Sequence, residues 1–259
     1  MICAGIDAGS RAIKVVLFDP TAAKPVGTGI TDQGIEQARL AEELYDQTLR
    51  KAGLERAQVQ SVVATGYGRT RVRFADTTIT EITCHACGVH HLVPDARTII
   101  EIGGQDSKVI QLEDGGQVRD FSMNDRCAAG TGRFLEVVAS RLGVGLAELG
   151  ELSRHSDKPA VISNTCVVFA ETEIIGLLAE GMPAPDIAAG VQIAIARRVA
   201  TLAGCALAQP VCFTGGVALQ AGMIRALEDA LRLPVQAAPN PQFTGALGAA
   251  ILATRNRPQ

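Results

Sequence analysis

The sequence predicts an α/β protein built from two lobes of similar construction. Strand-like and helix-like segments alternate along the 259 residues, which is the pattern of α/β folds. A strand, a glycine turn and a second strand occur in this order twice, near residue 2 and near residue 98. Internal repetition of this kind indicates repeated structural units. A chain of this length buries about three quarters of its unfolded surface, so a sizeable core is expected.

The first copy of the pattern spans residues 2–18. Two short apolar runs, Ile-Cys-Ala-Gly-Ile-Asp and Ile-Lys-Val-Val-Leu-Phe, flank the break Ala-Gly-Ser. Such runs on either side of a glycine break predict two strands joined by a tight turn. The segment that follows is expected to form a helix, a strand and a helix, over residues 36–52, 59–64 and 81–92.

The second copy spans residues 98–112, with strands predicted on both sides of a turn at 103–107. A long alanine-rich helix is expected from residue 184 to about 206. A buried strand at 211–213 then meets the turn Thr214-Gly215-Gly216. The final helix, over residues 243–252, is dense in small residues, as close helix packing at a hinge between lobes would require.

Two cysteines stand before predicted helices. Cys127 lies in Asn-Asp-Arg-Cys-Ala-Ala-Gly-Thr-Gly, residues 124–132, and Cys166 ends Ser-Asn-Thr-Cys; each is followed by apolar residues at helical spacing. A thiolate near a helix N-terminus has its charge offset by unpaired N–H groups, which favours metal ligation or reactivity. Two thiolates are half of the set that a tetrahedral site or a four-iron cluster takes. The simplest completion is a second copy of the chain across a two-fold axis.

Both glycine turns carry the residue types that phosphate binding uses, namely glycines, N–H groups and carboxylates for magnesium. The candidates are Asp7, Gly9, Ser10 and Lys14 in the first turn, Gly103, Gly104, Gln105 and Asp106 in the second, and Gly215 and Gly216 after the later strand. An ordinary glycine turn is the alternative for either copy alone, but two copies favour a nucleotide site. The common phosphate-loop and dinucleotide motifs are absent from the sequence.

Composition sets further bounds. The 24 basic and 27 acidic residues give a net charge of −3, which offers no electrostatic case for a nucleic acid or an anionic membrane as partner. The sequence has no signal-peptide pattern and no apolar stretch of membrane-spanning length, so a cytoplasmic location is expected. Seven cysteines argue against a disulfide framework and leave thiols for ligation or for the core.

Further segments make the chain recognisable: Ala-Thr-Gly-Tyr-Gly-Arg at 64–69, Cys-His-Ala at 84–86 and Gly-Ala-Leu-Gly-Ala-Ala at 245–250. With the cysteine segments, they closely resemble the ATP-dependent activators of 2-hydroxyacyl-CoA dehydratases, a family that includes the ATP-binding subunits of benzoyl-CoA reductase. The resemblance covers nearly the whole chain. It implies the two-lobed fold of acetate kinase, sugar kinases, Hsp70 and actin, which is ribonuclease H-like. We place the first lobe at residues 1–94 plus 245–259 and the second at 95–244.

The resemblance also implies a homodimer with one [4Fe–4S] cluster, ligated by Cys127 and Cys166 of both chains. The implied activity is a reductive ATPase, which takes one electron from a ferredoxin or flavodoxin and delivers it to an iron–sulfur acyl-CoA dehydratase or reductase. Nucleotide binding between hinged lobes is expected to move the two cysteine helices and so alter the cluster.

Roles in ATP hydrolysis follow from the two turns. Asp7 and Asp106 are assigned to magnesium, and Lys14 and the glycine N–H groups to phosphoryl charge. Gln105 or Asp106 would position the attacking water.

Two other functions stay open: a small-molecule kinase of the same fold, which leaves the cysteines idle, and an actin-like polymer. A metal at Cys84, Cys87 and His91 is the weaker alternative to buried packing. Cys3, Cys205 and Cys212 are assigned to the core, and His155 receives no role. The alternating Arg69, Arg71 and Arg73 suggest a strand with one solvated face, or secondarily a face for partner docking.

Overall fold

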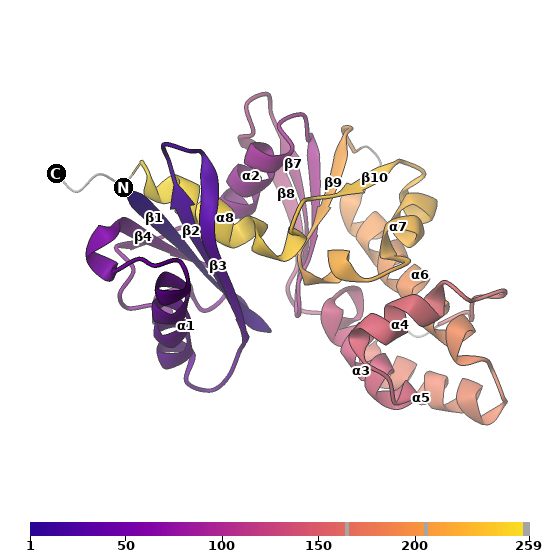
Figure 1. Cartoon of the computed structure of the whole chain (residues 1–259). Helices are drawn as coiled ribbons and strands as arrows, with labels where there is room; N and C mark the ends of the chain where they lie inside the picture. The colour runs from indigo at the N-terminus through magenta and orange to yellow at the C-terminus, as the bar shows by residue number, and fades with distance from the viewer. Residues whose placement is uncertain (164–165, 205–206, 256–259) are drawn as a thin grey trace. The chain divides into compact units, whose positions relative to one another are not determined.

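The structure, a computed structural model, describes residues 1–163, 166–204 and 207–255. Two compact units are formed (Figure 1): Met1–Ala96 with Leu112–Arg119 and Ala238–Gln259, and Arg97–Gln111 with Asp120–Ala237. Asn164, Thr165 and Cys205, which the sequence assigned to the cysteine motif and to the core, lie outside the described residues.

The first unit contains a five-stranded mixed sheet in the order β3-β2-β1-β4-β5. Its strands are β1 (Ile2–Ala8), β2 (Ala12–Asp19), β3 (Lys24–Asp32), β4 (Val59–Thr65) and β5 (Thr77–Thr78). The first three strands form an antiparallel meander, and β4 runs parallel to β1. The predicted first hairpin and the strand at 59–64 are therefore confirmed.

Helices cover both faces of this sheet because its central strands are apolar on both sides. From β2, Ile13, Val15 and Leu17 pack in one core with α1 (Gln37–Lys51). The intervening Val16 and Phe18 pack in another core with α8 (Thr244–Ala253). This alternation follows from the period-2 geometry of a strand. Figure 1 shows α1 and α8 with the sheet between them.

The α2 helix (Glu81–Leu92) packs on α8 at glycine contacts. A β-carbon on Gly88 would stand 2.0 Å from the Thr244 carbonyl oxygen, and one on Gly248 would stand 1.8 Å from the Cys84 carbonyl oxygen. Real β-carbons do not approach so closely, so both positions require glycine. Close packing by a helix rich in small residues is therefore confirmed within this unit, and its place at a hinge between lobes stays a prediction.

The second unit contains a five-stranded sheet in the order β10-β9-β6-β7-β8. Its strands are β6 (Thr98–Ile102), β7 (Ser107–Leu112), β8 (Val118–Asn124), β9 (Val211–Thr214) and β10 (Val235–Ala237). The β6–β7 pair is antiparallel, whereas β9 runs parallel to β6. The second predicted hairpin and the buried strand at 211–213 are thus confirmed.

The core of the second unit is built from the sheet and helices that follow the cysteines. These helices are α3 (Gly132–Leu142), α4 (Leu146–Ser153), α5 (Val167–Ala179), α6 (Ala184–Ala203) and α7 (Met223–Leu231). Phe134, Ile174 and Phe213 lie fully buried in one apolar cluster. The alanine-rich helix ends at Ala203, before Gly204 with a φ of 73°, and residue 206 lies outside the described residues.

The sequence predicted a strand through Arg69, Arg71 and Arg73. This prediction is wrong, because residues Arg69–Arg71 form a 3₁₀ turn, η2. Gly66 has a φ of 86°, and the Gly68 N–H group donates to the Ala8 carbonyl at 2.8 Å. These constraints curl the segment back against β1 before a strand can extend.

In the described part of the chain, no helix combines the length and the apolar character that crossing a bilayer requires.

Candidate functional site

Asp7 and Lys14 form a cross-strand pair at the end of the first hairpin. They are register partners on β1 and β2, and Lys14 Nζ donates to Asp7 Oδ2 at 3.2 Å. Gly9 N–H closes the turn onto the Ala12 carbonyl at 3.1 Å. A β-carbon on Gly9 would stand 3.1 Å from Lys14 Nζ. Glycine therefore leaves room for the lysine head beside the carboxylate, and Ser10 follows half-buried in the turn.

The two motif segments at 64–69 and 245–250 pack against the carboxylate of Asp7. A β-carbon on Gly66 would stand 2.4 Å from Asp7 Oδ1, and one on Gly245 would stand 3.5 Å from Asp7 Oδ2 and 3.1 Å from His85 Nε2. His85 is itself held by Thr244, with 2.9 Å between Nδ1 and Oγ1. Any side chain at position 66 would displace the carboxylate, so these glycines fix its place.

The second hairpin repeats this arrangement with different residues. Glu101 on β6 is the register partner of Lys108 on β7, and Lys108 Nζ donates to Glu101 Oε2 and to Asp106 Oδ2, each at 2.8 Å. Lys108 is 1% exposed and Glu101 4%. The Gly103 N–H group closes the turn onto the Asp106 carbonyl at 3.0 Å. A buried lysine between two carboxylates forms a compensated ion cluster.

Glu101 and Lys108 were missed by the sequence reasoning. In both hairpins the acid and the lysine are separated by 7 positions, and a glycine follows two residues after the acid. That spacing could have identified Glu101 as the counterpart of Asp7. Asp106 lies instead in the turn, half-buried, and Gln105 beside it is exposed.

Gly215, after β9, lies against the second hairpin. Its φ is 91°, and a β-carbon there would stand 2.7 Å from Glu101 Oε1 and 2.4 Å from the Ile102 carbonyl oxygen. Gly216 is exposed and has open space where a side chain would stand. The structure thus brings the later glycine pair to the second hairpin, within the second unit.

The second hairpin is also hydrogen-bonded to the helix that follows Cys127. Gly132 N–H donates to the Gly103 carbonyl and Arg133 N–H donates to the Gly104 carbonyl, both at 2.9 Å. A β-carbon on Gly132 would stand 3.1 Å from the Gly103 carbonyl oxygen, so the contact depends on a small residue. The first turn of α3 is therefore attached directly to the glycine turn.

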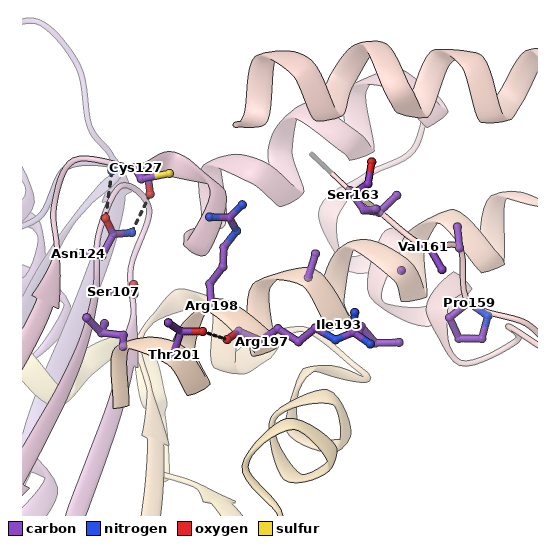
Figure 2. A pocket seen from close by; sticks show the side chains of 15 residues that line it. Ser107, Asn124, Cys127, Pro159, Val161, Ser163, Ile193, Arg197, Arg198 and Thr201 are labelled. Carbon is purple, nitrogen blue, oxygen red and sulfur yellow. Dashed lines mark hydrogen bonds between the residues drawn. The ribbon is translucent and has the colours of Figure 1, made fainter. Parts of the chain in front are cut away.

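Cys127 is held by Asn124 through two backbone contacts (Figure 2). Asn124 Nδ2 donates to the Cys127 carbonyl at 2.8 Å, and the Cys127 N–H group donates to Asn124 Oδ1 at 3.1 Å. Cys127 is half-buried and caps the 3₁₀ turn η3 (Ala128–Gly130), with α3 beginning at Gly132. The expectation that this cysteine opens a helix holds for the short turn rather than for α3 itself.

Cys166 is exposed and is the N-cap residue of α5. Two apolar side chains just after it, Val168 and Phe169, are 67% and 65% exposed. The segment before it and Cys127 share the walls of one cavity of about 740 Å³, since Ser163 and Cys127 both line it. In Figure 2, Arg198 extends from α6 toward the loop of Cys127.

Three other cysteines belong to the core, whereas Cys87 is half-buried and Cys205 lies outside the described residues. Cys3, Cys84 and Cys212 are fully buried, as the sequence predicted for Cys3 and Cys212. Burial raises the pKa of the Cys84 thiol to about 12 and raises the pKa of the Cys212 thiol to about 11. Within the described residues, no three His, Cys, Asp or Glu side chains gather in a metal-binding group.

The BadF/BadG/BcrA/BcrD ATPase family model matches residues 4–253. The chain belongs to this ATPase family. A relative from Anaerotignum propionicum, "Activator of lactoyl-CoA dehydratase", is 46% identical over 258 residues, covering 98% of this chain and 97% of that protein. A benzoyl-CoA reductase component of Thauera aromatica is 36% identical over 260 residues, covering 96% of this chain and 92% of that protein.

Solved structures of the ATPase family and of sugar kinases share the fold. The activator of the 2-hydroxyisocaproyl-CoA dehydratase from Clostridium difficile with bound ADPNP has a TM-score of 0.93 at 40% identity, covering 98% of this chain and 95% of that one. A ROK hexokinase from Thermus thermophilus has a TM-score of 0.54 at 17% identity, covering 98% and 99%, and shows the fold alone. The predicted two-lobed ATPase fold is therefore confirmed.

Membership in the BadF/BadG/BcrA/BcrD ATPase family confirms the resemblance drawn from the cysteine segments and the glycine motifs. It also confirms that the chain is an ATPase related to activators of 2-hydroxyacyl-CoA dehydratases. The individual roles assigned to Asp7, Lys14, Asp106, Cys127 and Cys166 remain predictions.

Proposed function

We propose that this chain is an ATP-dependent one-electron reductase that activates a 2-hydroxyacyl-CoA dehydratase. The identity to a dehydratase activator, 46%, is higher than the identity to a benzoyl-CoA reductase component, 36%, which favours a dehydratase as the acceptor. The donor would be a ferredoxin or flavodoxin, and the protein would work in the cytoplasm, where thiols stay reduced.

The observation that carries this proposal is the attachment of the second glycine turn to the helix of a candidate cluster ligand. The carbonyl groups of Gly103 and Gly104 accept the first N–H groups of α3, and α3 follows Cys127 by five positions. A nucleotide that shifts this turn must move the start of α3 or break two hydrogen bonds. An ATPase that moves a metal ligand in this way has the physical link that coupling requires.

The cysteine pair fits one [4Fe–4S] cluster per homodimer. Cys127 has its backbone fixed by Asn124, and Cys166 lies exposed at the N-terminus of a 13-residue helix. Two thiols from each of two chains supply the four ligands that such a cluster takes. When bound, the cluster would supply the low-potential electron. The exposed Val168 and Phe169 place apolar surface beside Cys166, where the second copy would pack.

The nucleotide would be handled by the two hairpins, one in each unit. Asp7 and the carboxylates of the second hairpin would hold Mg²⁺, which supplies charge neutralisation to the phosphates when bound. Lys14 offers a cation to a phosphoryl oxygen, and the exposed Gln105 could orient water. We retain residues 1–94 plus 245–259 and 95–244 as the two lobes of this ATPase.

The test is electron delivery in a defined mixture. The chain is purified anaerobically, its cluster is reconstituted and reduced with dithionite, and excess reductant is removed. Lactoyl-CoA dehydratase is then added with ATP or with a non-hydrolysable ATP analogue. Reduction of the acceptor, followed by electron paramagnetic resonance, is expected with ATP only.

One control variant makes the result specific. Cys166→Ser should hydrolyse ATP without delivering an electron, since the thiol lies outside both hairpins. Electron delivery at equal rates with and without ATP would contradict the proposal, as would phosphorylation of a small molecule in place of electron transfer.

A further inference from the structure

The first unit carries a hollow on its surface, and neither Asp7 nor Lys14 is among the residues that line it. Its volume is about 490 Å³. It is formed by the start of α1, the residues before it, and the segment around η2. The lining residues are Ile35, Glu36, Gln37, Ala38, Arg39, Arg71 and Arg73.

The hollow has an excess of positive charge. Arg39 is compensated by Glu36 and Glu43, each with a hydrogen bond of 2.7 Å. Arg71 and Arg73 are exposed and make no ion pair with any carboxylate among the described residues. Two uncompensated guanidinium groups thus face a cavity on a chain whose net charge is −3. We call this surface the arginine hollow.

Apolar side chains border the arginine hollow. Ile35 is fully exposed, and Tyr67 is 79% exposed. Tyr67 precedes Gly68, where a β-carbon would stand 2.9 Å from Gln37 Oε1 in the lining, so the tyrosine loop adjoins the hollow. Arginine and tyrosine are enriched at protein interfaces, where they provide much of the binding energy. A free anion would gain nothing from the exposed isoleucine.

The arginine hollow is attached to the first hairpin by backbone hydrogen bonds. The Gly68 N–H group donates to the carbonyl of Ala8, the neighbour of Asp7, and the Arg71 N–H group donates to the Gly68 carbonyl, each at 2.8 Å. Arg69 Nη1 also donates to the Gly66 carbonyl at 3.1 Å. A shift of the hairpin at Asp7 therefore shifts the loop that carries Arg71.

We propose that the arginine hollow docks an acidic segment of the protein that accepts the electron, with Arg71 and Arg73 pairing its carboxylates and Ile35 and Tyr67 packing on its apolar residues. This rests on the proposed function. The charge excess favours an acidic partner, and the apolar border favours a protein over a small anion. Because the loop that carries Arg71 is hydrogen-bonded to the hairpin of Asp7, docking of the partner and binding of the nucleotide would influence each other.

The experiment uses the reconstituted dimer with lactoyl-CoA dehydratase as the probe. The variant is the double substitution Arg71→Glu and Arg73→Glu. The control is Lys24→Glu with Lys51→Glu, which makes the same change of charge at two exposed positions of the same unit. The rate of acceptor reduction is measured against acceptor concentration at low and at high salt, and ATP hydrolysis is measured without acceptor.

We expect the double arginine variant to raise the acceptor concentration for half-maximal rate by about tenfold or more at low salt, because like charges oppose encounter. The effect should shrink at high salt through screening. ATP hydrolysis without acceptor should be unchanged, and saturating acceptor should restore the rate. The milder Arg71→Gln with Arg73→Gln should give an intermediate shift, and the lysine control should give almost none.

The outcomes separate the two proposals. If the unmodified chain reduces the acceptor and the arginine variants do so with the same concentration dependence, the docking proposal is wrong while the function stands. If the unmodified chain delivers no electron, the function is wrong and docking falls with it. If the arginine variants lose a binding to phosphatidylserine vesicles that the unmodified chain shows, and reduce the acceptor with unchanged kinetics, the hollow binds a membrane and the proposal is overturned.

Discussion

Asn124 holds Cys127 by both of its backbone groups, accepting from the N–H at 3.1 Å and donating to the carbonyl at 2.8 Å. One amide side chain thereby fixes the peptide units on both sides of a candidate cluster ligand. Since α3 begins with hydrogen bonds to the second glycine turn, Cys127 sits between two fixed points. Its position can change only if one of them moves.

Asn124→Ala should make the backbone of Cys127 more mobile while leaving its thiol in place. Both hydrogen bonds are lost, at a cost of about 1 kcal/mol each. Loss of outer partners of a metal ligand typically weakens binding by about tenfold or more. We expect iron to be removed from the reconstituted protein about tenfold faster by bathophenanthroline. In the cluster-free protein, alkylation of Cys127 should accelerate while that of Cys166 stays the same, and equal rates at both cysteines would contradict the role of Asn124.

Cys127→Ser and Cys166→Ser should each abolish the cluster and leave a folded ATPase. The unmodified protein should contain about four irons per dimer, because each chain offers two thiolates. Cys212→Ser, in the core, should keep the iron content. Native mass spectrometry checks the stoichiometry, and a monomer carrying four irons would show that the cluster is not shared.

Asp7→Asn and Asp106→Asn should lower ATP turnover by about two orders of magnitude, since a metal clamp on phosphoryl charge is worth several kcal/mol. Glu101→Gln tests the other carboxylate of the second hairpin. Glu101 stands opposite Lys108 as Asp7 stands opposite Lys14, so its loss should be as severe. Iron content should be unchanged in all three variants. Normal turnover in Asp7→Asn would mean that the first hairpin does not bind the nucleotide.

The sequence predicted the repeated hairpins and the main helices because their signals are local: apolar period, glycine breaks and cysteines before helical runs. Glu101 was missed because it lies inside the apolar run 98–102, where its partner Lys108 becomes visible only through strand register. Asn124 belongs to the motif around Cys127, but its role is not encoded there, since its contacts depend on how the loop folds back. These are tertiary relationships that no local pattern encodes.

Arg69, Arg71 and Arg73 show the opposite case, a local pattern that tertiary contacts override. Their alternation fits a strand, yet the hydrogen bond from Gly68 to Ala8 forces a turn. As a result Arg71 and Arg73 line one hollow while Arg69 bonds back to its own loop.

Gly248→Ala should destabilise the fold by about 1–3 kcal/mol or more, the usual cost of overpacking. The added methyl group would lie 1.8 Å from the Cys84 carbonyl oxygen, where α8 meets α2. The matched control is Gly176→Ala within α5, where a β-carbon meets nothing within 4 Å. That change should stabilise by about 0.5–1 kcal/mol through helix propensity. Urea unfolding of both variants checks the sign, and a neutral Gly248→Ala would mean that the helices separate readily.

Alkaline pH should destabilise the protein through its buried thiols. Burial raises the pKa of Cys84 from 9.0 to about 12, so between these values the folded state keeps a proton that the unfolded chain has released. The contribution is fully present below pH 9 and is lost as the pH rises toward 12. The free energy of unfolding should then fall by up to about 1.4 kcal/mol per pH unit for each such group.

Cys212, whose pKa is raised from 9.0 to about 11, adds to the pH dependence of the free energy of unfolding between these two values. Cys84→Ala should flatten the pH dependence by one proton. Urea midpoints measured between pH 8 and pH 10.5 under reducing conditions would show this, and an equal slope in Cys84→Ala would mean that its thiol ionises with no hindrance in the folded state.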